Sequence, residues 1–481
     1  METRNSQKMR VWICCKMKVK KISTTFFTGI IIMSLLFLAV GFHSKYQAQT
    51  NFDQWLHNRL GFGPHPSQSS KVHRVQRNRS TKQHSPRSCQ PKTNVMFLKT
   101  HKTASSTVLN LLYRFGEKHN LTFALPSKYL LDYPKFFRSR SVKGFPLQDG
   151  RHYNIMCNHM RFNRSEVQKV MPADTFYFSI LRNPVTMAES SYSYFKFLAP
   201  SFNRSASFED FITDPWKYYV PNLRYNHLAR NLLWFDFGFD HNANFSLQSA
   251  QVGVAEIQQS FHLILLAEYF DQSMVLLRDA LCWSLDDIVT FRLNFRSNET
   301  QWRLSPAQED RLKQWNAMDW YLYQSFNKTF WQQVESFGKS RMDQEVASLQ
   351  ARREELANLC LLKGGKPADA SQILDEVVQP YQSGQADILG YNLNLNLSLP
   401  DKERCLRMIM PEHQHKDLLD SKQFPSTEAV KKQTVANGDS RLQEKVQEAI
   451  KVTMSSKNRT SPTRSLLETP GTSYLISTDV S

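Results

Sequence analysis

Glycine is missing from the stretch of this chain that would need it most for binding a nucleoside triphosphate. No glycine occurs between Val95 and Phe115, whereas the nucleoside-triphosphatase loop requires the pattern G-x-x-x-x-G-K-[ST]. The 481 residues also contain no HExxH motif, no CxxC pair and no internal repeat. These absences argue against the common phosphate loop and predict no metal site, but they leave open an anion site of another kind.

Charge is absent from residues 22–42, a run of 21 positions. Such a run can cross a hydrocarbon core of about 30 Å as a helix. Seven basic residues precede it, which predicts that residues 1–21 form a cytoplasmic tail and that the rest of the chain is luminal. A cleaved signal peptide is the alternative, but its apolar run is shorter, about 7–15 residues, and no cleavage site follows Phe42. We therefore expect a single-pass transmembrane signal anchor.

Aromatic residues are absent between Ser67 and Asn94, within a polar and basic segment. Residues 43–93 have little to bury and are predicted to form a flexible luminal stem. The chain carries a net charge of +18, but a basic segment without aromatic side chains in a luminal compartment does not favour nucleic acid as a partner. The Ser/Thr/Lys-rich residues 424–481 are predicted to be disordered.

The segments beyond the anchor carry signatures of a secreted or luminal protein. Five cysteines lie there, so at most two internal disulfides can form; Cys360 and Cys405 are candidates for one pair, and the connectivity is otherwise open. Glycosylation sequons of the form N-x-[ST] are spread along the same part of the chain. They begin at Asn78, Asn120, Asn163, Asn203, Asn244, Asn298, Asn327, Asn396 and Asn458.

The stretch 95–107, V-M-F-L-K-T-H-K-T-A-S-S-T, predicts a buried strand, a polar loop and the start of a helix. A helix N-terminus presents unpaired N–H groups and about half a positive charge. The hydroxyls of Thr103, Ser105, Ser106 and Thr107 would add donors, and Lys102 a full charge. An ordinary turn with a solvated lysine is the alternative, and the local sequence does not decide between the two.

Further apolar runs followed by helical patterns predict a mostly parallel sheet covered by helices. The expected strands lie at 153–157, 174–183 and 261–267. Arg182 ends the second of these, Pro184 opens the next helix, and Ser190 follows about two turns later. An arginine and a hydroxyl placed in this way can bind a phosphate. A structural arginine and a solvent-facing serine are the alternative.

Several other polar residues are candidates for a second ligand. His159 and Arg161 follow the strand at 153–157, where open α/β sheets bind ligands, and a histidine there can act as a general base. Arg230 and Asn231 lie in an aromatic-rich segment, 208–238, whose ring faces and polar donors suit a sugar, although core packing explains such aromatics equally well. We also expect long helices at 304–337 and 342–362, and Asp271 as an N-cap.

Three features coincide: the K-T-A-S-S-T loop, the R-N-P motif with a serine eight residues beyond its arginine, and the N-terminal anchor. Together they resemble the carbohydrate sulfotransferases of the Golgi. Four longer strings look like the galactose 3-O-sulfotransferase family, over residues 94–423: F-L-K-T-H-K-T-A-S-S-T-V-L-N-L-L, C-N-H-M-R-F-N, A-R-N-L-L-W-F-D-F-G and A-E-Y-F-D-Q-S-M-V-L-L. Details and the long C-terminal segment look most like its type 4 member, which acts on core 1 O-glycans.

The resemblance implies a sulfotransferase-type, P-loop-like parallel sheet flanked by helices, and a type II Golgi membrane protein. It implies 3′-phosphoadenosine 5′-phosphosulfate (PAPS) as sulfate donor, without an obligatory metal, and galactose-terminated glycans of glycoproteins as acceptors. Lys102 would neutralise the leaving phosphate. The residues around the 5′-phosphosulfate would be Lys99, Thr100, Thr103, Ala104, Ser105, Ser106 and Thr107.

The same resemblance assigns Arg182 and Ser190 to the 3′-phosphate, and His159 to the base that takes the proton of the sugar hydroxyl. The family commonly shows two adjacent histidines where this chain has Asn158 and His159. We expect Arg161, Arg230 and Asn231 to contact the acceptor.

Alternatives to this assignment remain at the level of sequence. N-acetyllactosamine or galactosylceramide would be other acceptors. A non-catalytic galactose-binding protein on the same fold would not need Lys102, Arg182 and Ser190 together, and a luminal kinase would need glycines and a metal-binding acid near the loop. Whether the protein forms a homodimer through its stem is open.

Overall fold

The structure is a computed structural model that describes residues 89–147, 150–297 and 302–425. The predicted cytoplasmic tail, the predicted transmembrane segment, nearly all of the predicted stem and residues 426–481 lie outside this part of the chain. Within the described ranges, no helix is both long and apolar enough to cross a membrane.

The central sheet has four parallel strands in the order β3-β1-β5-β6. They are β1 Val95–Leu98, β3 Ile155–Met156, β5 Phe176–Leu181 and β6 Leu263–Leu266. All four strands are buried along their length, as expected for a parallel sheet covered on both faces. The structure thus confirms the predicted parallel sheet flanked by helices.

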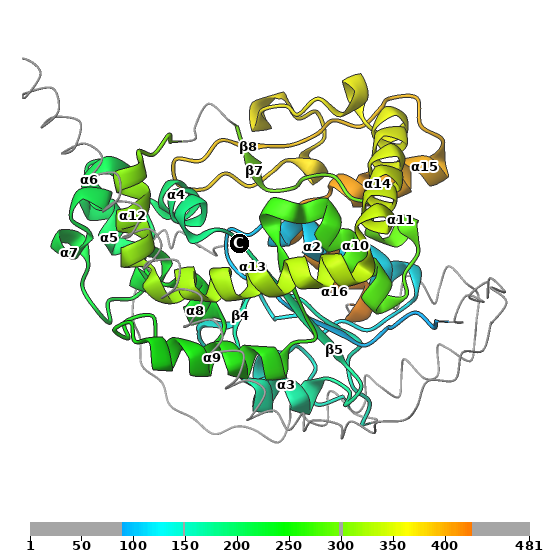
Figure 1. The fold of residues 1–481 in the computed structure, drawn as a ribbon. Helices are drawn as coiled ribbons and strands as arrows, with labels where there is room; N and C mark the ends of the chain where they lie inside the picture. Colours follow the sequence, from blue (N-terminus) through cyan, green and yellow to red (C-terminus); the bar gives the residue numbers. More distant parts are fainter. Residues whose placement is uncertain (1–88, 148–149, 298–301, 426–481) are drawn as a thin grey trace, which may run out of the picture. The chain divides into compact units, whose positions relative to one another are not determined.

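Helices connect the strands and pack around the sheet (Figure 1). Each of β1, β5 and β6 is followed by the helix that the sequence predicts, α2, α4 and α10, and α13 runs across the strands in the view shown. The helices are α2 Ser105–Lys118, α3 Arg164–Val170, α4 Pro184–Phe195, α5 Pro200–Arg204, α6 Phe208–Thr213, α7 Pro215–Tyr218, α8 Leu232–Asp236, α9 Leu247–Ser260, α10 Phe270–Leu281, α11 Leu285–Ile288, α12 Pro306–Trp315, α13 Ala317–Phe337, α14 Lys339–Cys360, α15 Leu399–Ile409 and α16 Glu412–Gln423.

Two small sheets lie outside the central one. β2 Leu131–Phe136 pairs in parallel with β4 Met160–Arg161, and β7 Phe295–Arg296 pairs antiparallel with β8 Ile388–Leu389. Because β3 ends at Met156 and β4 begins at Met160, His159 stands between two strands, and its carbonyl accepts a hydrogen bond from the Leu131 amide.

Two local predictions were wrong. The expected helix at 304–337 is two helices, α12 and α13, separated at Asn316, whose side-chain oxygen accepts a hydrogen bond from the Asn231 amide. Asp271 does not cap α10, because the helix begins one residue earlier, at Phe270. Its carboxylate instead pairs with Arg353 on α14. In both cases the side chain has a partner far away in the sequence, which no local pattern identifies.

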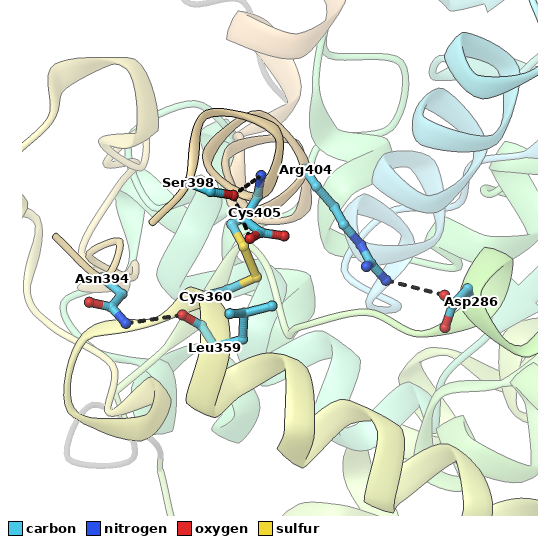
Figure 2. Close-up of a disulfide and its surroundings, with 8 residues drawn as sticks. Asp286, Leu359, Cys360, Asn394, Ser398, Arg404 and Cys405 are labelled. Atoms are coloured by element: carbon cyan, nitrogen blue, oxygen red, sulfur yellow. Dashed lines mark hydrogen bonds and ion pairs between the residues drawn. A yellow bond between two sulfur atoms is a disulfide. The ribbon is translucent and has the colours of Figure 1, made fainter. Parts of the chain in front are cut away.

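Two disulfides tie distant parts of the chain together. Cys360 and Cys405 are bonded, as the sequence suggested, and join the end of α14 to α15 (Figure 2). Arg404, next to Cys405, also pairs with Asp286 at 3.2 Å. Cys89 bonds to Cys282 just after α10, and Cys157 is a free, buried thiol.

The predicted glycosylation sites differ in accessibility. Asn163 and Asn327 are half-buried in the structure, and Asn78, Asn298 and Asn458 lie outside the described residues. The remaining sites have exposed side chains: Asn120, Asn203, Asn244 and Asn396. Occupancy of each sequon stays a prediction.

Candidate active site

A cavity of about 940 Å³ opens at the carboxyl ends of β1, β5 and β6. This is the edge at which open α/β sheets bind ligands, and the volume lies in the range usual for small-molecule sites. Most of the predicted donor-binding and catalytic residues line it, as do residues 290–296 and part of α14. The predicted residues in its wall are Lys99, Lys102, Thr103, Ala104, Ser105, Ser106, Thr107, His159, Arg182 and Ser190.

The loop between β1 and α2 is held in shape by its own hydroxyl groups. Ser105 and Thr103 both donate hydrogen bonds to the Thr100 carbonyl, at 2.6 and 3.2 Å. Thr100 donates to the Ile180 carbonyl on β5 and does not line the cavity. Lys102 and Ala104 take left-handed backbone conformations, with φ of 59° and 62°. The loop therefore makes its sharp turn without glycine and places α2's N-terminus at the cavity.

Lys102 is the cation at the tip of this loop. Its ammonium lies 3.4 Å from the centre of the Tyr194 ring. Burial, and then the nearby Arg296 and Arg182, lower the pKa of Lys102 well below its ordinary value. Because neighbouring cations oppose its charge, an anion bound between them would favour the charged form. The electrostatics thus suit an anionic ligand.

Arg182 and Ser190 lie beside the loop, and their binding of a 3′-phosphate stays a prediction. An Arg182 Nη1 donates to the Lys102 carbonyl at 3.1 Å, and its Nε donates to the Thr186 hydroxyl at 3.1 Å. Ser190, on α4, is buried and lines the same cavity. The fold thereby joins the two motifs that are separated along the chain.

Three further arginines in the cavity wall have no motif that could have predicted them. Arg292 and Arg296 come from the segment before and within β7, and Arg353 comes from α14. Arg296 pairs with Glu189 and donates to Ser193 at 2.8 Å, and Arg353 pairs with Asp271. With Lys99, Lys102 and Arg182 they make six cations, against three carboxylates in the wall: Glu268, Asp271 and Glu354.

Glu412, at the start of α16, contacts the loop between β1 and α2, although it lies near the other end of the described chain. Its carboxylate accepts from the Lys99 ammonium at 3.0 Å and from the Ser106 hydroxyl at 3.1 Å. The Lys99 side chain is only 1% exposed, so this pair satisfies a charge that would otherwise be costly to bury. No local sequence signal identifies Glu412.

His159 contacts the same lysine. Its Nε2 lies 2.6 Å from Lys99 Nζ, and its Nδ1 lies 2.8 Å from the Lys99 carbonyl oxygen. Burial, and then the nearby His101 and Lys99, lower the pKa of His159 well below its ordinary value, so its ring is neutral at pH 7. A neutral ring is what a general base requires.

A second imidazole, His101, is stacked on His159 with ring centres 3.9 Å apart. His101 also lines the cavity. Its Nδ1 lies 3.0 Å from both carboxylate oxygens of Asp236, and its amide donates to the same carboxylate at 2.9 Å. No local pattern in the sequence identifies His101 as part of a histidine–carboxylate pair, because Asp236 is 135 residues away.

The residues predicted to contact the acceptor are not in the wall of this cavity. Arg161 donates to the Phe239 carbonyl at 2.8 Å and lies over the rings of Phe136 and Phe235. Arg230 is stacked among aromatic rings, those of Trp216, Tyr219 and Trp315. Asn231 donates to the His241 carbonyl at 3.0 Å. Their role in acceptor binding stays a prediction.

Among the described residues, no group of three or more histidine, cysteine, aspartate or glutamate side chains is placed to hold a metal ion. What the cavity wall does offer is hydroxyls, a helix N-terminus and cations, which are ligands for anions.

The fold is that of an α/β protein, and its cavity lies at the loop between β1 and α2, where the lining residues suit an anion. A sequence model of the galactose-3-O-sulfotransferase family matches residues 28–423. Galactose-3-O-sulfotransferase 2 of Mus musculus is 52% identical over 342 residues, which cover 70% of this chain and 86% of that protein. The chain therefore belongs to the galactose-3-O-sulfotransferase family and is a sulfotransferase.

Two other relatives place the chain within this family. Galactose-3-O-sulfotransferase 4 of Homo sapiens is 40% identical over 413 residues, covering 71% of this chain and 85% of that protein. Galactosylceramide sulfotransferase of Homo sapiens is 43% identical over 332 residues, covering 68% and 78%. Identity with the type 2 protein is thus higher than with the type 4 protein, which weighs against the closer likeness to type 4 that the motifs suggested.

Proposed function

We propose that this enzyme transfers the sulfuryl group of PAPS to the 3-hydroxyl of a terminal β-galactose on glycans, with core 1 O-glycans (Galβ1-3GalNAc) of glycoproteins as the first acceptor to test. The observation that carries the proposal is the convergence of Lys102, Arg182 and Ser190 on one cavity with the N-terminus of α2. Membership of the family supports galactose as the sugar and implies a sulfate donor.

The donor set in the cavity fits PAPS. Six cationic side chains line it against three carboxylates. Burial and then the neighbouring cations lower the pKa of Lys102, and a bound polyanion would offset the repulsion between those cations. When bound, PAPS supplies a sulfuryl group with a phosphate leaving group. Lys102 and the N-terminus of α2 would bind the 5′-phosphosulfate. Arg182 and Ser190 would bind the 3′-phosphate.

The protein's own task in such a transfer is to position groups and stabilise charge. Lys102 would stabilise the charge that grows on the leaving oxygen, and a neutral imidazole in the cavity would take the proton from the sugar hydroxyl. The resemblance to the family predicts His159 for this task. The ion pair between Lys99 and Glu412 links the start of the loop to α16.

The predicted subcellular location of the enzyme is consistent with this function. We place it in the Golgi membrane as a single-pass type II protein with a luminal catalytic domain, on the basis of the charge-free run at 22–42 and the basic residues before it. Two disulfides in the described domain are compatible with an oxidising compartment.

A direct assay tests the proposal. Full-length enzyme in detergent would receive PAPS labelled in its sulfuryl group together with Galβ1-3GalNAc, Galβ1-4GlcNAc or galactosylceramide, and the products would be analysed for 3-sulfation. Label on Galβ1-3GalNAc alone supports the core 1 assignment. Label on another acceptor alone keeps the reaction and changes the acceptor. Absence of label on all three, with the Lys102→Ala variant equally inactive, contradicts the proposal.

A further inference from the structure

We propose that His101, oriented by Asp236, is the general base that takes the proton of the acceptor hydroxyl, and that His159 is a positioning residue. The inference rests on the proposed sulfuryl transfer and concerns which of two stacked imidazoles performs one step of it. It follows from the hydrogen-bond partners of the four ring nitrogens.

Both ring nitrogens of His159 are committed within the protein. The Lys99 carbonyl can only accept, so the Nδ1 of His159, 2.8 Å away, carries the proton. In a neutral ring the Nε2 is then an acceptor, and the Lys99 ammonium lies against it at 2.6 Å. Lys99 is in turn held by Glu412. His159 therefore has no lone pair left for a substrate hydroxyl unless this chain of contacts breaks.

His101 has the opposite arrangement. The Asp236 carboxylate, 3.0 Å from Nδ1, can only accept, so Nδ1 of His101 carries a proton, and in the neutral ring Nε2 presents its lone pair. This Nε2 is buried and has no hydrogen-bond partner within the described structure. Because buried nitrogens are nearly always satisfied, an orphaned acceptor on a cavity-lining histidine points to a ligand hydroxyl as its partner.

The surroundings of Asp236 favour the His101 tautomer that carries its proton on Nδ1. It is fully buried at the end of α8 and receives hydrogen bonds from the His101 amide and, at 3.0 Å, from the Tyr133 hydroxyl. A carboxylate that orients a histidine through Nδ1 and stabilises the imidazolium that forms is the arrangement of acyl-transfer triads. The other groups near the His101 ring are His159, Tyr133, His227 and Phe195.

The step balances with these groups. As the hydroxyl oxygen forms its bond to sulfur, its proton moves to Nε2 of His101. The bond between sulfur and the bridging oxygen breaks, and its electron pair stays on the 5′-phosphate beside Lys102. His101 is left as an imidazolium paired with Asp236 and returns its proton to water after product release.

Two single substitutions separate the roles. We expect His101→Gln to lower kcat by about 10²–10⁴-fold, the usual contribution of a general base, while affinity for adenosine 3′,5′-bisphosphate, measured by calorimetry, stays within about threefold. We expect His159→Gln to lower kcat less and to weaken bisphosphate binding more, because it releases Lys99. His262→Asn, at the opposite edge of the sheet before β6, is the control and should keep both values.

Nitrogen NMR of the histidine rings gives a readout that does not depend on turnover. In protein labelled with ¹⁵N-histidine we expect the Nε2 of His101 to be unprotonated near pH 7, and Asp236→Asn to shift the ring toward the other tautomer and lower kcat at least tenfold. Thermal unfolding and bisphosphate binding show whether each variant is folded.

The outcomes distinguish the inference from the function on which it rests. Full kcat in folded His101→Gln, with activity lost in His159→Gln, would overturn the inference and return the base to His159. A protonated Nε2 on His101 in the native enzyme would overturn it as well. An inactive native enzyme would contradict the proposed function, whereas the ring tautomers would still report on the His101–Asp236 geometry.

Discussion

The loop at 99–107 and the segment at 208–241 are both rich in polar and charged residues, yet they use them in opposite ways. In the loop, the charged tip of Lys102 and the first turn of α2 face a cavity. In the segment, the guanidinium of Arg230 is stacked among three aromatic rings and is only 8% exposed. The first arrangement leaves charge available for a ligand, and the second uses charge to pack the fold.

The difference lies in where the backbone places each segment. The loop follows a central strand at the carboxyl edge of a parallel sheet, where helix N-termini converge. Arg230 follows a short 3₁₀ turn and precedes α8, among the aromatic residues of α7 and α12. Residue type alone does not separate an arginine that binds a ligand from one that packs in the core. Substitutions can test whether the loop acts in ligand binding and the segment in packing.

Removing the carboxylate that holds the loop should have the largest effect. Glu412→Ala leaves the buried Lys99 without its ion pair, which we expect to lower the free energy of unfolding by about 3–5 kcal/mol. Denaturant unfolding measures this. Glu412→Gln, which keeps a hydrogen-bond acceptor, should lose less, and equal loss in both variants would show that the charge is unimportant.

The charge at the tip of the loop should matter for catalysis more than for folding. We expect Lys102→Ala to reduce kcat/KM by about 10²–10³-fold, as for removal of one transition-state donor, with the unfolding midpoint nearly unchanged because Lys102 faces the cavity. Steady-state sulfation assays measure the loss. A change below tenfold would mean that the six cations of the wall are interchangeable.

The Cys360–Cys405 disulfide braces the helices that lead to Glu412. Replacing both cysteines by serine should lower the free energy of unfolding by about 2–4 kcal/mol, because the bond closes a loop with a sequence separation of 45 residues. Bisphosphate binding should weaken only slightly if α16 keeps its place. A strong loss of binding at temperatures where the variant remains folded would show that the brace also positions the loop.

The smallest effect is expected in the aromatic segment. Arg230→Lys keeps the charge but loses the planar group that stacks on the rings. We expect stability to fall by about 1 kcal/mol, with the acceptor KM unchanged. A raised acceptor KM at unchanged stability would instead support the sequence-based prediction that Arg230 contacts the sugar, and would bring the two regions closer in function.

The parts of the site that the sequence predicted are those with a local pattern. A buried strand, a hydroxyl-rich loop and an amphipathic helix identify residues 95–107, and R-N-P identifies the end of β5. Asp236 and Glu412 have no such pattern, because each meets the loop across a long stretch of chain, 135 and 306 residues. The break at Asn316 and the partner of Cys89 escaped prediction for the same reason.

The contact between Ser106 and Glu412 has a consequence for biosynthesis. The loop belongs to the first described strand-and-helix unit, and the carboxylate that completes it is made 306 residues later. A ribosome-bound chain that has not yet exposed α16 therefore carries Lys99 without its counter-charge. The loop therefore reaches its described geometry only after α16 has been synthesised and has folded back onto it.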